Sequence, residues 1–139
     1  MEISLVRKRL GEAIDRAKRE AAERRSRSDQ ASRDFDVFLQ KIAVPLFRQV
    51  ANALKAEGYG FTVFTPSGSV RLMSDRSASD YVELTLDTSE NPPQVVGHVM
   101  RERGRRVLDT ERAIGTPETL TEEQLLDFLL KELEAFVGR

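Results

Sequence analysis

The stretch that decides the fold is LGEAIDRAKREAAERRSRSDQASRDFDVFLQKI, residues 10–42. Apolar or small side chains recur in it in alternating steps of four and three residues, which is the spacing of a coiled-coil seam on one face of a helix. The pattern continues on both sides and predicts a long amphipathic helix over residues 2–57. The seam positions that we expect to contact a partner helix are Leu10, Ile14, Ala17, Ala21, Ala31, Phe35 and Phe38.

The middle of this helix is weakly apolar, because the seam there carries Arg24 and Ser28. An unbroken helix over residues 2–57 would be about 84 Å long at about 1.5 Å per residue, which exceeds the size of a compact domain of this length. The sequence therefore leaves two alternatives open. Either the chain folds back near Ser26 to Asp29, or the helix projects and a second subunit covers its seam. We favour a partner helix, in a homodimer.

Residues 35–57 carry larger apolar side chains than the segment before them, so we expect them to dock on the core. Pro45 lacks the N–H of a regular helical residue and its ring crowds the preceding turn, which predicts a kink near this position. The chain is accordingly predicted to consist of a helical, coiled-coil-like extension, residues 1–34, and a single α+β domain, residues 35–139.

From Tyr59 to Arg112 apolar and polar residues alternate with a period of two, which is typical of strands with one buried face. Turns are indicated at residues 66–68, at the Asn-Pro-Pro sequence of residues 91–93 and at Gly104. This pattern predicts a four- or five-stranded antiparallel meander sheet.

A C-terminal amphipathic helix follows, and it is expected to begin at Thr121 in a capping box with Gln124. Its apolar residues cover more of its circumference than one sheet face can bury, so we expect an outer stripe to contact a second helix. This outer stripe, which we assign to the oligomer or partner interface, consists of Leu126, Leu130 and Val137. Together the predicted elements give the fold class α+β.

Composition excludes several kinds of chemistry. The chain has 139 residues, a net charge of −1 and no cysteine, so it has no disulfide framework and no thiolate metal site. It contains no H-E-x-x-H, EF-hand or phosphate-loop motif, and we expect neither a metal nor a cofactor. No stretch approaches the roughly 18 apolar residues that span a bilayer, and charge appears too early for a signal peptide. These features favour a cytoplasmic protein without a membrane partner.

His98 is the only histidine, and the alternating pattern places it within a strand, where we interpret it as a structural residue. A catalytic set would have to be built around it, with Tyr81 and Arg101 as the nearest candidates in the predicted sheet. Because the carboxylates nearby have no spacing that brings two of them to one reacting group, we expect no enzyme activity.

Four arginines, Arg101, Arg103, Arg105 and Arg106, surround Gly104 at a predicted hairpin tip. Arginine clusters bind phosphate groups, and the basic run of residues 7–27 would add to such a site. Acidic residues lie beside both segments, however, and no aromatic residue is available at the tip for stacking. Nucleic-acid or anionic-ligand binding through the tip and the basic helix is therefore the alternative function and not the favoured one.

The overall pattern resembles small bacterial proteins, a resemblance that implies no particular activity. The excess of apolar helix surface, without a catalytic set, favours a non-enzymatic interaction or scaffold protein. Such a protein would self-associate, or bind another protein, through its long N-terminal helix.

Overall fold

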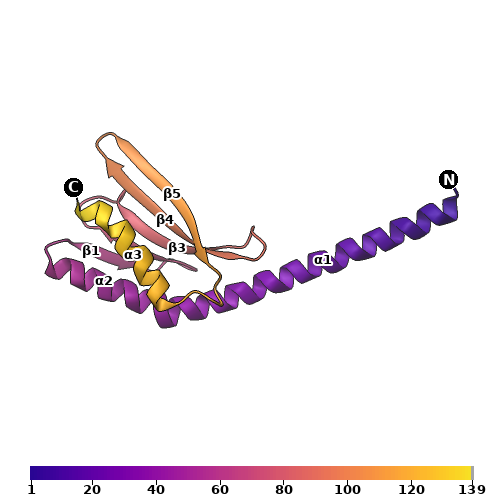
Figure 1. Ribbon diagram of the computed structural model, residues 1–139, viewed down its shortest axis with the longest axis horizontal. Helices are drawn as coiled ribbons and strands as arrows, with labels where there is room; N and C mark the ends of the chain where they lie inside the picture. Colours follow the sequence, from indigo (N-terminus) through magenta and orange to yellow (C-terminus); the bar gives the residue numbers. More distant parts are fainter. Residues whose placement is uncertain (139) are drawn as a thin grey trace.

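The computed structural model describes residues 1–138 and confirms the α+β fold. Figure 1 shows a body formed by the sheet, α2 and α3, from which most of α1 projects. In chain order the elements are α1 (Ile3–Phe38), the π-helical turn η1 (Leu39–Ala43), α2 (Val44–Ala56), β1 (Phe61–Phe64), β2 (Val70–Ser74), β3 (Tyr81–Asp87), β4 (Gln94–Arg103), β5 (Arg106–Gly115) and α3 (Glu122–Val137).

The helix α1 runs without a break through Ser26 to Asp29, so the alternative in which the chain folds back there is wrong. Serine and aspartate cost less than about 0.7 kcal/mol each in a helix interior, whereas a break would release backbone hydrogen bonds. No proline or glycine lies between Gly11 and Pro45 to cause one. The 36 residues of α1 extend about 54 Å at about 1.5 Å per residue.

The predicted kink near Pro45 takes the form of a π-helical turn. This turn, η1, lies directly before α2, whose first turn contains Pro45. Because proline has no N–H and its ring crowds the carbonyl group four residues earlier, a regular α-helix cannot continue through it. A wider turn before the proline removes the conflict. The chain bends at this place, and α2 then lies along the body (Figure 1).

The five strands form one antiparallel sheet in the order β1-β2-β3-β4-β5, which confirms the predicted meander. Side chains alternate between its two faces, and Val70, Leu72, Val82 and Leu84 on one of them are fully buried in the core. Phe136 of α3 packs edge-on against Phe61 of β1 on this side, with ring centroids 6.1 Å apart. We call this the helix face of the sheet, and the opposite one the open face.

The start of α3 confirms the predicted capping box. The backbone N–H of Gln124 donates to Oγ1 of Thr121 at 3.1 Å, and the backbone N–H of Thr121 donates to Oε1 of Gln124 at 3.0 Å. Both donors would otherwise lack a partner within the helix. The preceding residue, Leu120, is buried beside Leu125, and together these contacts fix the direction in which α3 crosses the sheet.

Gly97 of β4 lies directly against the ring of Phe128 of α3. A Cβ atom at this position would lie only 2.2 Å from Cζ of Phe128. We therefore expect Gly97→Ala to lower the free energy of unfolding by about 1–3 kcal/mol, the usual cost of overpacking a core, as measured by urea denaturation. Phe128→Leu in the same chain should recover part of this loss, and a fully additive double variant would contradict the contact.

Candidate functional site: an exposed helix arm and an arginine ribbon

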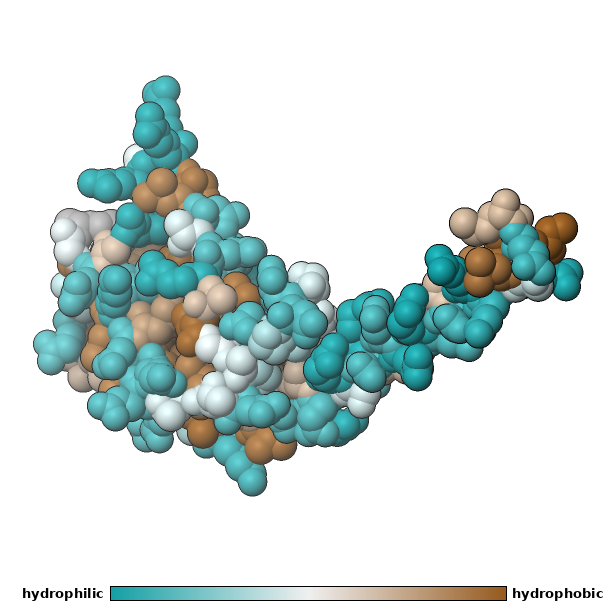
Figure 2. Space-filling model, turned by 45° about the vertical axis from the view of Figure 1, so that its right-hand side comes forward, coloured by the Kyte–Doolittle hydropathy of each residue, from teal (hydrophilic) through white to brown (hydrophobic). Residues whose placement is uncertain are grey.

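The first candidate site is the part of α1 that extends beyond the body, residues 3–27, which we call the arm. It carries four large apolar side chains on one side of the helix, and all are exposed: Ile3, Val6, Leu10 and Ile14. Leu10 is 58% exposed and Ile14 is 44% exposed. Figure 2 shows apolar side chains gathered at the free end of this helix. Large apolar side chains this exposed along one line of a helix indicate a surface for another molecule.

The predicted seam divides at the point where α1 meets the body. Ala17 is exposed and Ala21 is half-exposed on the arm, whereas Ala31, Phe35 and Phe38 are buried in the chain's own core. These three residues were predicted to contact a partner, and the structure places them in the core instead. The spacing of the seam residues is the same in the exposed and in the buried part of α1. The two parts differ in that the body covers the seam from Ala31 onward and leaves it open before that residue.

The predicted outer stripe of α3 is mostly covered. Leu126 packs against the core and is half-buried, and Val137 is also half-buried, whereas Leu130 is 52% exposed. The core, including the neighbouring η1, takes up much of the apolar surface of α3, which the sequence alone assigned to a partner. A single exposed leucine is normal on a protein surface, so α3 gives little support to a second interface.

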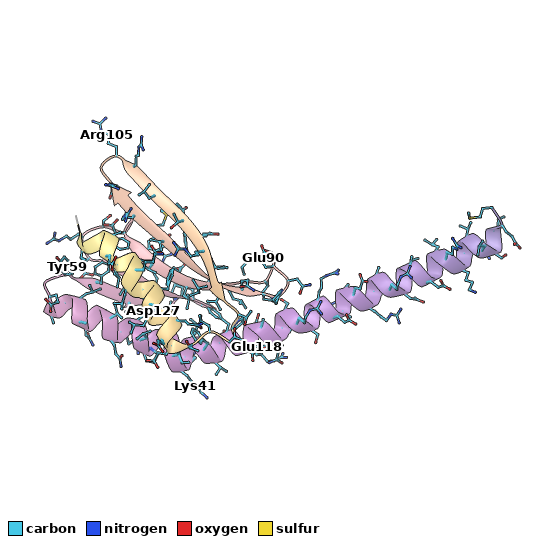
Figure 3. The ribbon with its side chains drawn as sticks, in the orientation of Figure 1. Lys41, Tyr59, Glu90, Arg105, Glu118 and Asp127 are labelled. Carbon is cyan, nitrogen blue, oxygen red and sulfur yellow. The ribbon has the colours of Figure 1, made fainter. Side chains whose placement is uncertain are left out.

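The second candidate site is the hairpin of β4 and β5, whose strands have ten residues each. It extends beyond the rest of the sheet, and Arg105 points into solvent at its tip (Figure 3). Gly104 turns the chain with φ of +63°, a conformation that glycine adopts without strain. We call residues 101–108 the arginine ribbon. It contains the predicted residues Arg101, Arg103, Arg105 and Arg106.

The arm and the arginine ribbon lie at opposite ends of the molecule (Figure 1). From the sequence, the basic run of residues 7–27 and the hairpin tip are expected to act together as one anion-binding surface. The structure does not bring them together within one chain. Each has to be considered as a separate site.

His98 lies on the open face, where it takes part in a row of contacts that crosses four strands. Its Nε2 is 2.5 Å from Oδ1 of Asp109, and its ring packs edge-on against Tyr81 with centroids 5.6 Å apart. Arg71 lies over the Tyr81 ring at 4.1 Å and forms an ion pair with Glu83 at 2.7 Å. Burial raises the pKa of Tyr81 above its ordinary value, although the positive charge of Arg71 opposes this effect.

The structure does not bring the three members of the hypothetical catalytic set together. Arg101 is three residues after His98 in the same strand, so its side chain lies on the other face of the sheet from His98 and Tyr81. The complete row of contacts on the open face was not predicted from the sequence. The alternation of β3 and β4 indicates which of their residues share this face. The residues of β2 and β5 that lie beside them can be identified only from the register that pairs β2 with β3 and β4 with β5.

The chain matches no family model, curated protein or solved structure with which it was compared. Any statement about its function therefore rests on its own residues. Among residues 1–138, no group of three or more histidine and acidic side chains could hold a metal ion. Over the same residues, no helix is long and apolar enough to cross a membrane.

Proposed function

We propose that this chain is a self-associating interaction protein, and that its arm pairs with the arm of a second copy. The observation that supports this proposal is the row formed by Ile3, Val6, Leu10 and Ile14, which is exposed on the arm, the part of α1 that the body does not touch. Helices of this kind gain most of their stability from packing of an apolar face. A second identical arm supplies a matching face.

The position of the body favours an antiparallel pair. From Ala31 onward the body covers the same face of α1 that carries the seam. A parallel partner on that face would bring its own body to the place that the first body occupies. It would also align Arg7 with Arg7 and Arg24 with Arg24 at seam positions, where like charges repel. In an antiparallel pair the two bodies lie at opposite ends.

One antiparallel register pairs Ile3, Leu10 and Ile14 with apolar partners, whereas Val6, at the edge of the seam, lies opposite Lys18. It places Leu10 of each copy against Ile14 of the other, and Ile3 against Ala21. Arg7 then lies opposite Ala17 and meets no like charge. The small residues Gly11 and Ala13 flank the centre of the contact, which allows the two backbones to approach closely.

This register fits the space that the structure leaves free. The overlap runs from Ile3 to Ala21, about 28 Å at about 1.5 Å per residue, and it ends before Ala31, where the body begins. The weak seam positions Arg24 and Ser28 remain outside the contact. They form the solvated connection between the paired arms and each body, which explains why this part of the helix needs no apolar residue.

Disulfide cross-linking tests this pairing directly, since the protein contains no cysteine. Leu10→Cys and Ile14→Cys are made as separate variants and oxidised either alone or as a mixture. We expect the mixture to give a covalent heterodimer on non-reducing gels. Each variant alone should cross-link poorly, because equivalent residues are then offset by about 6 Å along the axis.

Other outcomes would contradict the proposal in distinguishable ways. Efficient cross-linking of Leu10→Cys with itself would indicate parallel arms. A mass equal to the single-chain value of 15.7 kDa at all micromolar concentrations, measured by light scattering for the unmodified protein, would show that the arm does not bind a second copy. Glu12→Cys is the matched control, because its side chain lies on the opposite side of the helix from the seam.

A further inference from the structure

We propose that the arginine ribbon is a second binding site, which contacts the phosphate backbone of duplex nucleic acid. This inference is independent of the pairing of the arms, because the ribbon lies at the other end of the body. It rests on the way in which the strand register of β4 and β5 sorts charge between the two faces of the hairpin.

The register places the basic residues on one face. Gly97 faces Phe128 of α3, and its strand partner Arg112 forms an ion pair with Glu132 of α3 at 3.3 Å. The helix face of the hairpin is therefore the one that carries residues 97, 99, 101 and 103, since side chains alternate along a strand. Arg101 and Arg103 lie on this face, together with Arg106, the strand partner of Arg103.

The acidic residues lie on the other face. Glu102, Asp109 and Glu111 alternate with the arginines and belong to the open face, where Asp109 contacts His98 and Glu102 accepts a hydrogen bond from Ser77. In the linear sequence these carboxylates appear to neutralise the arginines. In the folded hairpin they point away from them, so the helix face of the ribbon carries three arginines, and the acidic residue beside them is Glu134 of α3, at the base next to Arg101 and Arg103.

The placement of the arginines also lowers the stability of the hairpin. Arg103 and Arg106 are directly opposite each other in the last pair before the turn, and like charges in such a pair destabilise a hairpin. In the part of the chain that the structure describes, none of the ribbon's four arginines forms an ion pair. A bound anion would relieve the repulsion and would use guanidinium donors that are otherwise left to water.

The shape of the site favours a duplex as the source of the phosphates. A two-stranded ribbon fits a DNA groove, and the tip of this one, with Arg105, projects beyond the helices. Residues 100–115 contain no aromatic side chain, so the ribbon offers no surface on which the bases of a single strand could stack. The expected contacts are to phosphates, and binding should depend little on sequence.

The test measures the anisotropy of a fluorescent duplex DNA of mixed sequence, and of one of its single strands, as the full chain is added at several salt concentrations. For the unmodified protein we expect tighter binding to the duplex at low salt. In Arg103→Ala/Arg105→Ala/Arg106→Ala we expect affinity at low salt to fall at least about tenfold. The slope of log affinity against log salt should fall by about three, since each phosphate contact contributes about 0.9.

The matched control is Arg19→Ala/Arg25→Ala/Arg27→Ala, which removes the same charge from the arm. It should bind almost as well as the unmodified protein, and circular dichroism should show both triple variants folded. The proposal is overturned if the unmodified protein does not bind the duplex at low salt, if it binds the single strand more tightly, or if the arm variant loses as much affinity as the ribbon variant.

Discussion

Replacing Leu10 and Ile14 together by glutamate is expected to convert the proposed dimer into monomers. In the antiparallel register these residues form the two central layers, so the change removes four large apolar side chains from the interface. At about 1.5 kcal/mol for each buried side chain, the loss is about 6 kcal/mol. This corresponds to a dissociation constant raised roughly ten-thousandfold, at about 1.4 kcal/mol per tenfold change. Sedimentation velocity over a range of concentrations measures it.

Leu5→Glu provides the control for this experiment. Leu5 is an exposed apolar residue of the same arm, 38% accessible, but it lies about 140° around the helix from Leu10. Its replacement should leave the mass in solution unchanged. Equal effects of the two variants would mean that the arm associates through general hydrophobicity and not through its seam. Because all three residues are outside the body, the circular dichroism of each variant should remain that of a folded protein.

The seam shows where sequence reasoning about the arm succeeds and where it stops. The steps of four and three from Leu10 to Phe38 were sufficient to predict a helix, and the structure confirms it. The same spacing could not distinguish residues that meet the chain's own sheet from residues left open, because Phe35 and Leu10 are equivalent in the pattern. Only the place where the body begins to cover α1, at Ala31, separates them.

The ribbon shows a different limit. The cluster of arginines around Gly104 predicted the hairpin tip correctly, since β4 and β5 turn at this glycine. Neighbouring glutamates and aspartates made the site look neutral in the linear sequence. Alternation along a single strand already separates Arg101 and Arg103 from Glu102, but the charges of β5 could be assigned to a face only with the register, which pairs Arg103 with Arg106.

Close contacts between elements far apart in the chain were not predictable. Gly97 fits the alternating pattern of its strand, and nothing in the sequence indicates that a larger residue would not fit there. The reason lies in Phe128, which comes 31 positions later and whose ring occupies the space above Gly97. A sequence pattern describes one element at a time, whereas this contact depends on the direction in which α3 crosses the sheet.

Phe35→Ala is expected to produce the largest loss of stability of any single substitution considered for this protein. Phe35 is 1% exposed and belongs to the core that joins α1 to the sheet. Truncating a buried phenylalanine removes its transfer free energy and leaves a cavity, at a cost of about 3–5 kcal/mol. This is a large share of the stability of a single domain. Urea denaturation measures it, in the Leu10→Glu/Ile14→Glu background so that association does not contribute.

Val37→Ala is the matched control, two residues away on the same helix but 52% exposed. Its expected effect is within about 0.5 kcal/mol, as for most surface positions. A loss below about 1 kcal/mol for Phe35→Ala would contradict the docking of α1 on the sheet. The pair of experiments separates two roles that one seam performs in one helix. Changes at Phe35 should alter the stability of the body, whereas changes at Leu10 and Ile14 should alter association and leave that stability unchanged.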